Sequence, residues 1–204
     1  REMAVEGATT MDLEMAAEKM IADAGAKPAF KGYYVPAAGE AFKFVLCTSV
    51  NEEIVHGMPN VKRVLKKGDI VSIDTGVKLD GYYGDSAITV PIGEVSEQTK
   101  KLLQVTRESL ELAIEKVRPG NRLSDVSATV EKYVKGNGFS IVREYVGHGI
   151  GTQLHEEPQV PNYVDRKNEN PKLKAGMVLA VEPMVNAGKP EAMVLKDKWT
   201  AVTR

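Results

Sequence analysis

The sequence contains a single cysteine, Cys47, so no disulfide can form within the chain, and this cysteine usage is typical of a reducing compartment. An excess of charge of one sign is also lacking. The chain has 27 basic residues against 28 acidic ones, which gives no support for a nucleic-acid partner or an anionic membrane surface. No run of about 18 apolar residues occurs, and no signal-peptide pattern opens the chain. These absences predict a cytoplasmic protein with no membrane partner.

The residues that are present predict a globular chain of helices and strands. Apolar residues make up 43% of the 204 positions, enough for one sizeable core or for two small lobes that share one. Apolar residues have helical spacing at about 10–24, 96–117 and 123–135. In the first of these segments, the predicted inward face contains Leu13, Ala17, Met20, Ile21 and Ala24. Strands are predicted at 43–50, 69–77, 82–90, 140–146, 177–185 and 199–204, with a two-residue turn between the second and third.

Two pairs of segments resemble each other within the chain. Residues 7–25 match residues 120–138 at an offset of 113 (120 − 7), and residues 67–74 match residues 175–182 at an offset of 108 (175 − 67). Two matches in the same order favour a duplicated α+β half. We therefore expect one catalytic domain over 1–204, built from pseudo-repeat halves of about 1–94 and 95–204. The first residue, Arg1, and the strand-like last residues lead us to expect a fragment that lacks both ends.

Three acidic residues are candidate metal ligands. Asp74 and Glu182 are equivalent in the repeat, and each ends an apolar strand, where a buried charge is costly without a cation or strong donors. The two-residue turn places Gly76 opposite Asp85, so Asp74 and Asp85 become diagonal neighbours on one face of a hairpin. A bound cation would compensate two such charges. The alternative is a wet hairpin with solvated acids, although Gly76 and Gly84 favour a crowded site.

The chain's three histidines are the other candidates. His148 lies in Gly-His-Gly-Ile-Gly, whose glycines let the backbone approach another element closely, and imidazole suits soft or borderline metals. His155 follows seven residues later (155 − 148), a spacing that would stack the two rings on a helix, but the glycines disfavour a helix. We therefore expect His148 on a strand edge and His155 on the following loop. His155 and His56 are each either surface groups or residues that bond the substrate or accept a proton.

Four blocks of sequence together resemble the bacterial type I methionine aminopeptidases. They are VSIDTGV with GYYGDSA, EYVGHGIG, LHEEPQVPNY and MVLAVEPMVN, and the likeness runs from about residue 9 to residue 199. Each block is a weak signal by itself, but all four in this order and spacing are highly specific. The resemblance implies an α+β pita-bread fold, in which antiparallel strands are backed by helices and the site lies between pseudo-symmetric halves. It also implies metal-dependent removal of the N-terminal methionine from nascent proteins and peptides.

Carried over residue by residue, the resemblance implies two divalent metal ions, which are Co, Mn, Fe or Zn. The implied ligands are Asp74, Asp85, His148 and Glu182. Asp85 is expected to bridge both metals, and Glu182 is also a candidate to relay the proton of the attacking water. A further bridging glutamate of a later motif has no match here, so we expect this chain by itself to be inactive or only feebly active.

The resemblance also implies residues that contact the peptide. His155 matches the histidine that contacts the scissile amide, and His56 matches one near the substrate amine or leaving group. Tyr33, Cys47 and Trp199 match wall positions of the pocket for the methionine side chain. The segment 34–44 is longer than in the best-known members, which leaves open whether Phe42 belongs to that wall.

The expected partner is the N-terminal peptide of a nascent protein, bound by a monomer, with the ribosome as a candidate partner. Two alternative functions remain at this point. One is a proline-specific aminopeptidase or prolidase on the same fold, although such enzymes usually carry an extra N-terminal domain. The other is a non-catalytic pita-bread binding protein, although such relatives have lost metal ligands that this chain retains.

Overall fold

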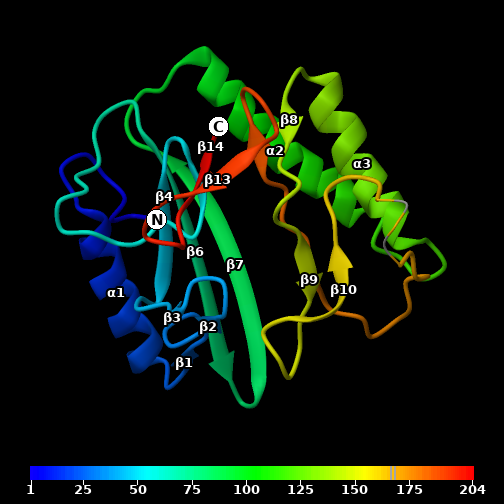
Figure 1. The fold of residues 1–204 in the computed structure, drawn as a ribbon, viewed down its shortest axis with the longest axis horizontal. Coiled ribbons are helices and arrows are strands. Elements are labelled where there is room, and N and C mark those ends of the chain that lie inside the picture. The colour runs from blue at the N-terminus through cyan, green and yellow to red at the C-terminus, as the bar shows by residue number, and fades with distance from the viewer. Residues whose placement is uncertain (166, 168) are drawn as a thin grey trace. The chain divides into compact units, whose positions relative to one another are not determined.

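The computed structural model describes residues 1–165, 167 and 169–204 (Figure 1). Its helices are α1 (Thr10–Asp23), α2 (Glu97–Ile114) and α3 (Leu123–Gly136). Its strands are β1 (Lys27–Pro28), β2 (Tyr34–Val35), β3 (Glu40–Ala41), β4 (Leu46–Val50), β5 (Glu53–Val55), β6 (Ile70–Leu79), β7 (Tyr82–Pro91), β8 (Ser140–Ile141), β9 (Gly147–Gly149), β10 (Glu156–Val160), β11 (Leu179–Ala180), β12 (Val185–Asn186), β13 (Ala192–Val194) and β14 (Ala201–Thr203).

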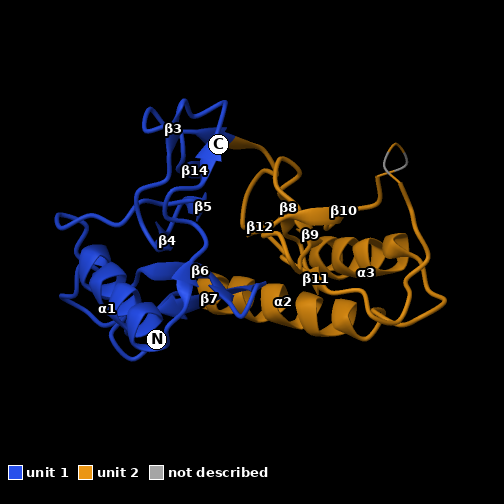
Figure 2. Cartoon of the chain, turned by 90° about the horizontal axis from the view of Figure 1, so that it is seen from below, with its two compact units in different colours: residues 1–96, 193–202 blue, residues 97–192, 203–204 orange. Residues whose placement is uncertain are grey.

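The chain divides into two compact units, which are coloured separately in Figure 2. Unit 1 comprises residues 1–96 and 193–202, and unit 2 comprises residues 97–192 and 203–204. The division after Ser96 lies two residues from the expected end of the first half at 94 (96 − 94). Residues 193–202 belong to unit 1, although they were expected in the second half, 95–204. These residues follow the repeated segments, so the repeat carries no information about their place.

Helix α1 begins with a reciprocal cap. The Thr9 hydroxyl accepts the backbone N–H of Asp12 at 3.1 Å, and the Asp12 carboxylate accepts the backbone N–H of Thr9 at 2.7 Å. Such a capping box satisfies two donors that a helix start otherwise leaves unbonded. The chain turns away at Gly25, whose φ of +66° is readily adopted by glycine. The helix predicted from the apolar spacing is therefore confirmed at both ends.

The inward face of α1 differs from the prediction at three positions. Leu13 and Ile21 are buried as expected, but Met20 is 71% exposed, and Ala24, which follows the last residue of the helix, is exposed as well. Glu14 is buried instead, at 4% exposure, and its two carboxylate oxygens accept the N–H groups of Val45 and Leu46 at 2.7 and 2.8 Å. The buried side of α1 thus includes a charged residue, because that residue supplies acceptors to the start of β4.

The sheet of unit 1 is antiparallel and has the hairpin β6–β7 as its longest part (Figure 1). β4 pairs with the other edge of β6, and β1 extends that edge. The hairpin turns at Asp80 and Gly81, which both have positive φ, as a two-residue turn of this kind requires. The core between α1 and the sheet is formed by Leu13, Ile21, Val45, Leu46, Val50, Leu65, Val71, Val90 and Ile92. Full burial of each such side chain contributes about 1.5–3 kcal/mol.

Unit 2 packs α2 and α3 against each other and against short strands. Its core contains Val105, Ala113, Leu123, Val126, Val130, Val134, Phe139, Ile141, Val160 and Leu173. Helix α2 ends at Ile114, three residues before the predicted end at 117 (117 − 114). Lys116 and Val117 donate instead to the carbonyls of Ala113 and Ile114, at 2.9 and 3.0 Å, so the last turn tightens to i→i+3 bonds.

Two predicted strands are broken in unit 2. The segment 140–146 forms only β8, because the Glu144 carboxylate accepts the N–H groups of Arg143 and Ala192 at 3.0 Å each, in place of a ladder. The segment 177–185 splits into β11 and β12 on either side of Pro183, which has no N–H to donate. Between them the Glu182 carbonyl accepts the Asn162 side-chain amide at 2.7 Å.

The internal repeat is found again in the hydrogen bonds of the two units. Gly7 N–H donates to Leu65 O at 2.9 Å, and Gly120 N–H donates to Leu173 O at 3.0 Å. The return bonds from Leu65 and Leu173 to Ala8 and Asn121 follow the same offsets of 113 (120 − 7) and 108 (173 − 65). One half of the α1 capping box recurs at α3 with the same offset, since Arg122 N–H donates to the Asp125 carboxylate at 2.7 Å as Thr9 N–H does to Asp12. Each repeat is therefore a helix whose start is tied to the loop before the next strand.

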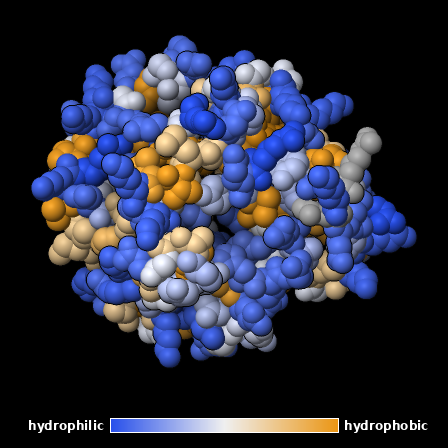
Figure 3. Space-filling model, in the orientation of Figure 1, coloured by the Kyte–Doolittle hydropathy of each residue, from blue (hydrophilic) through white to orange (hydrophobic). Residues whose placement is uncertain are grey.

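The surface view in Figure 3 shows hydrophobic residues in separate patches broken by hydrophilic ones. In the described part of the chain, no helix combines the length and the apolar character needed to cross a membrane.

Candidate functional site

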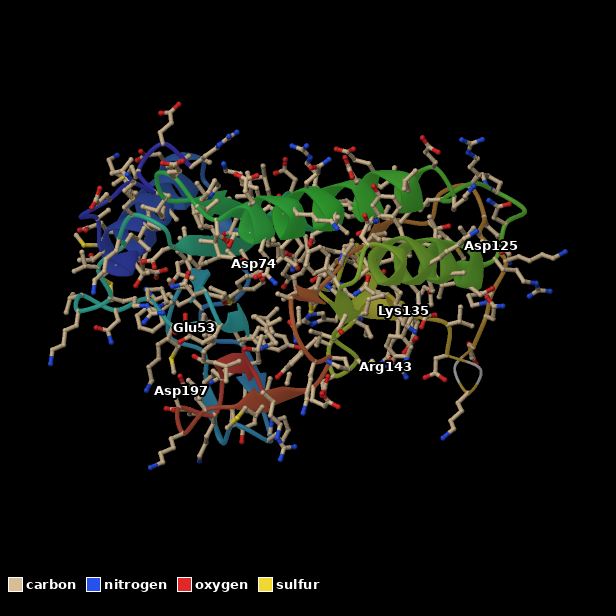
Figure 4. All side chains as sticks on the ribbon, turned by 90° about the horizontal axis from the view of Figure 1, so that it is seen from above. Glu53, Asp74, Asp125, Lys135, Arg143 and Asp197 are labelled. Atoms are coloured by element: carbon tan, nitrogen blue, oxygen red, sulfur yellow. The ribbon has the colours of Figure 1, made fainter. Side chains whose placement is uncertain are left out.

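Asp74 and Asp85 lie on one face of the β6–β7 hairpin (Figure 4 labels Asp74). Gly76 is directly opposite Asp85, and Asp74 is directly opposite Ala87, so the two acids are diagonal neighbours. The register predicted from the two-residue turn is therefore confirmed. Diagonal positions of this kind bring Cβ atoms within about 7–8 Å, which is within reach of long side chains or of a shared cation.

Gly76 and Gly84 were predicted to mark a crowded site beside the two acids, and Gly76 does so. A Cβ added at Gly76 would lie 2.7 Å from the Phe30 ring and 3.0 Å from the Ala29 Cβ, so this face of the hairpin is covered beside Asp85. The same expectation was wrong for Gly84, where an added Cβ would meet no atom within 4 Å. Gly84 belongs to the opposite face of the hairpin because the side-chain direction alternates along a strand.

Cys47 lies on β4 directly opposite Asp74. Burial raises the pKa of its thiol well above the ordinary value, and the negative charges of Asp74 and Asp85 raise it further, against a lowering hydrogen bond from the His56 backbone. The negative charges of Asp74 and Asp85 are therefore both felt at the Cys47 sulfur. The thiol stays protonated at neutral pH, and such a cysteine behaves as a small apolar side chain.

His56 and Trp199 lie beside Cys47 in unit 1. The His56 backbone has a φ of +59°, which is uncommon for a residue with a side chain, and its ring meets Trp199 edge-on at a centroid distance of 6.4 Å. Trp199 packs with Phe42 at 5.1 Å, and both belong to the buried cluster that contains Cys47. Phe42 thus joins Cys47 and Trp199 in one cluster, and its place in the wall of a side-chain pocket stays a prediction. Tyr33 is 38% exposed and meets Phe42 through its backbone, because Phe42 N–H donates to Tyr33 O at 2.8 Å.

His148 lies on the central strand of the sheet β10–β9–β11 in unit 2. The flanking glycines are required by close neighbours. A Cβ at Gly147 would lie 2.2 Å from Ala180 O, and a Cβ at Gly149 would lie 2.4 Å from Glu157 O. The close approach predicted for these glycines is therefore confirmed, and it places the backbone of the buried His148 (8% exposed) between two neighbouring strands.

One ring nitrogen of His148 is hydrogen-bonded to a backbone carbonyl, and the other faces a carboxylate. Nδ1 lies 2.8 Å from Gly149 O, and because a carbonyl only accepts, Nδ1 carries the proton of this bond. Nε2 lies 3.4 Å from Glu182 Oε1. In the neutral imidazole both Nε2 and Oε1 are electron-pair donors, so a proton or a cation is needed between them.

This arrangement fits a divalent metal. Histidines that bind metals donate their other ring N–H to a backbone carbonyl or a carboxylate, as His148 donates to Gly149 O. One nitrogen and one carboxylate oxygen suit Zn, Fe, Co or Mn. The acids Asp74 and Asp85 offer oxygen donors of the same kind in unit 1. Each unit therefore carries two of the four predicted ligands.

No group of three or more His, Cys, Asp or Glu side chains placed to hold a metal is found within residues 1–165, 167 and 169–204. The candidate donors are thus two pairs, one in each unit. Their joining into one centre stays a prediction.

A cavity of about 490 Å³ surrounds the two histidines of unit 2. The His148 and His155 rings meet edge-to-face at a centroid distance of 4.3 Å, with 69° between their planes. The prediction that these residues lie on a strand and on the following loop is correct. The rings nevertheless meet, because the β9–β10 hairpin folds back on itself. The cavity is lined by Val146, Gly147, His148, Gln153, His155, Glu156, Glu157 and Gln159.

Sequence reasoning missed the two glutamines of this cavity. Gln159 is directly opposite His148, while Glu156 is opposite Gly149, so two residues between them bulge out of the ladder. Such a bulge re-aims side chains. An unbroken register would pair His148 with Glu157 instead. The Glu157-Pro158 pair was the only available signal, because proline is confined to edge strands and bulges.

The chain matches the model of metallopeptidase family M24 over residues 1–202. It belongs to this family. Methionine aminopeptidase 1 of Bacillus subtilis is 53% identical to it over 97% of this chain and 76% of its own length. The crystal structure of methionine aminopeptidase from Thermotoga maritima has a TM-score of 0.93 and 46% identity, and the match covers 99% of this chain and 78% of that one.

A prolidase from Pyrococcus furiosus has a TM-score of 0.67 at 24% identity and covers 97% of this chain, which shows a shared fold alone. The expected pita-bread fold of the M24 enzymes, with mixed helices and antiparallel sheets, is confirmed. As an M24 metallopeptidase, the chain is a hydrolase that depends on a divalent metal.

Proposed function

We propose that this M24 chain removes the N-terminal methionine from proteins and peptides. The observation that carries the proposal is the likeness to enzymes named methionine aminopeptidase, at 53% identity for one relative and a TM-score of 0.93 for one structure. The geometry agrees with hydrolytic chemistry, because a histidine nitrogen faces a carboxylate oxygen beside an open cavity. The prolidase alternative is not favoured, since its support is a shared fold at lower identity.

The ligands of the proposal are Asp74, Asp85, His148 and Glu182, and the cofactors are two divalent ions chosen among Co, Mn, Fe and Zn. Such ions lower the pKa of a bound water and polarise the peptide carbonyl. The hydrogen bond from His148 Nδ1 to Gly149 O holds the tautomer in which Nε2 is the ligand. Glu182 supplies a carboxylate 3.4 Å from that nitrogen, which can also take up the proton of the water.

The peptide would contact the remaining residues. His155 lines the cavity beside His148, where it can bond the scissile amide. His56 lies against Trp199, near the side-chain pocket to which Tyr33, Cys47 and Trp199 are assigned. A neutral thiol and aromatic rings make this wall apolar, as methionine requires. Apolar fit of this kind discriminates between side chains by about 1–3 kcal/mol.

The cellular setting belongs to the same proposal. The chain's single cysteine and its bacterial relatives are in keeping with a cytoplasmic monomer. Its substrates would be the N-terminal peptides of nascent proteins, with the ribosome as a candidate partner. Residues 1–204 would act as one catalytic domain, with Asp74 and Asp85 in unit 1 and His148 and Glu182 in unit 2.

The test combines metal binding with peptide cleavage. The chain is titrated by calorimetry with Co, Mn, Fe or Zn, and release of Ala-Ser from Met-Ala-Ser is followed with each metal. We expect one of these metals to bind at two sites and the Asp85→Asn variant to lose at least one of them. Asp80→Asn is the matched control, because Asp80 lies at the turn of the same hairpin.

The outcomes separate the parts of the proposal. Unchanged metal binding by Asp85→Asn would remove Asp85 from the ligands. Cleavage of Ala-Pro in preference to Met-Ala-Ser would favour the prolidase reaction. Since the calorimetry needs no turnover, the ligands are tested even if the chain by itself cleaves feebly.

A further inference from the structure

One carboxylate side chain is hydrogen-bonded to the loop between the two histidines of unit 2. This loop, residues 150–155, joins β9 to β10 and forms part of the cavity wall. Among its backbone bonds, Ile150 N–H donates to Val178 O at 3.2 Å and Gly151 N–H donates to Gln153 O at 3.2 Å. Ile150 and Leu154 are buried, whereas the exposed Thr152 and Gln153 between them depend on a polar restraint.

The Glu156 carboxylate supplies that restraint. Its Oε1 accepts the backbone N–H of Gln153 at 2.9 Å and the hydroxyl of Thr152 at 3.1 Å. The loop also wraps tightly around the carboxylate, since a Cβ at Gly151 would lie 3.0 Å from Oε1 and 3.1 Å from Oε2. These hydrogen bonds lower the pKa of Glu156, so the group remains the charged, stronger acceptor at neutral pH.

The restraint acts on both sides of His155. Gln153 is bonded two residues before this histidine, and Glu156 follows it directly and is paired with Gly149 at the start of β10. The backbone of His155 is therefore fixed between two anchored positions. Its exposed ring is held 4.3 Å from the ring of His148, in the orientation that lines the cavity.

We propose that Glu156 is a positioning residue, whose carboxylate folds the loop 151–155 and thereby fixes the His155 imidazole against His148. This inference rests on the proposed function only in giving His155 a role at the peptide bond. Misplacement of such a group by about 1 Å can lower a rate by as much as two orders of magnitude. The position of the His155 imidazole at the peptide would thus be set by Glu156, a residue that does not touch the reacting atoms.

Three variants test the arrangement. Glu156→Ala removes the acceptor, whereas Glu156→Gln retains one oxygen that can accept both donors. Glu131→Ala is the matched control, because Glu131 also accepts a backbone N–H, from Val164 at 3.0 Å, and lies outside the cavity lining. Glu131 also pairs with Lys135 and Arg143, which Figure 4 labels, so its removal disturbs unit 2 without touching the loop.

The first readout is structural and needs no activity. The chain has three histidines, so labelling of histidine alone gives an NMR spectrum in which each ring is resolved. We expect a nuclear Overhauser effect between the His148 and His155 rings in the unmodified chain, in Glu156→Gln and in Glu131→Ala. We expect its loss in Glu156→Ala, with helical circular dichroism unchanged. Retention of this effect in Glu156→Ala would overturn the proposal.

The second readout is kinetic, with Met-Ala-Ser and the activating metal. We expect Glu156→Ala to lower kcat at least tenfold with little change in KM, and Glu156→Gln to stay within about threefold of the unmodified chain. A Glu156→Ala variant that loses the ring contact but keeps its kcat would show that the position of His155 does not matter for the reaction. Absence of cleavage by the unmodified chain would leave the NMR result to decide the role of Glu156.

Discussion

Glu14 shows how a single residue can couple a helix to a sheet. It is buried on α1, and both carboxylate oxygens accept backbone N–H groups at the start of β4. Its removal would leave two buried donors unbonded, and each such donor costs about 1–3 kcal/mol. We expect Glu14→Ala to lower the free energy of unfolding by about 2–4 kcal/mol, as measured by urea denaturation. Glu18→Ala is the control, since the Glu18 pair with Lys31 is exposed. A loss no larger than that of the control would contradict the assigned role.

The pH dependence of Glu14 has a defined sign. Burial raises its pKa, against the lowering hydrogen bonds from Val45 and Leu46. A carboxyl group with a raised folded pKa contributes stability that is complete below the unfolded value of about 4.3 and is lost as the pH rises through the folded value. We therefore expect the stability difference between the unmodified chain and Glu14→Gln to shrink as the pH rises through this window. Urea midpoints at a series of pH values measure it, and a difference that grows would contradict the assigned direction.

Residue-scale prediction from sequence worked where chain geometry decides the outcome. The diagonal relation of Asp74 and Asp85 followed from a two-residue turn and strand alternation, and the structure has that register. The burial of Glu14 could not be predicted in this way, because its acceptors are satisfied by N–H groups more than thirty residues away along the chain (|i−j| of 31 and 32). Apolar spacing alone favours Met20 over Glu14 at the inward face.

At the scale of elements, the strand β9 requires glycine at a position where a side chain would not fit. The backbone of Gly147 lies so close to β11 that an added Cβ would be 2.2 Å from Ala180 O. We expect Gly147→Ala to push the strands apart and to lower the free energy of unfolding by at least about 1–3 kcal/mol, as overpacking does. Gly84→Ala is the matched control, because this glycine is also in a strand but has no neighbour within 4 Å. Thermal unfolding measures both variants. Equal stabilities would contradict the prediction, because they would show that β9 and β11 accommodate the added Cβ without loss of stability.

Helices were easier to predict than strands, and the reason is local. The start of α1 depends on Thr9 and Asp12, which are three residues apart, so the sequence contains the whole signal. The strand predicted at 140–146 is broken where the Ala192 N–H donates to the Glu144 carboxylate, and the one at 177–185 is broken at Pro183, beside the bond from the Asn162 side chain to the Glu182 carbonyl. Ala192 and Asn162 are distant partners that no local pattern announces, whereas Pro183 was a local signal for the second break.

At the scale of the whole molecule, the proposed ligands come from both units. A ligand that binds only the folded chain stabilises it by about 2.7 kcal/mol at one hundred times its Kd. We therefore expect the preferred metal among Co, Mn, Fe and Zn to raise the Tm, and EDTA to reverse the rise. Asp85→Asn in unit 1 and His148→Asn in unit 2 should each reduce the rise, whereas Asp80→Asn should not. A rise that neither substitution reduces would contradict the assignment of these residues as ligands.

The duplication was the whole-molecule feature that sequence could reveal. The offsets of 113 and 108 relate hydrogen bonds such as Gly7 to Leu65 and Gly120 to Leu173. The return of residues 193–202 to unit 1 could not be predicted, since these residues lie beyond the repeated segments. The strand β14 pairs there with β5, and only the folded chain brings the two together.

Trp199 has a practical consequence for experiments on the two units. It is the chain's only tryptophan, and it packs against Phe42 and His56 in unit 1. Helical ellipticity comes mostly from unit 2, whose helices α2 and α3 have 18 and 14 residues, against 14 in α1. Intrinsic fluorescence and far-ultraviolet dichroism are therefore separate optical reporters for the two units. Any gap between their denaturation midpoints measures how cooperatively the duplicated halves unfold.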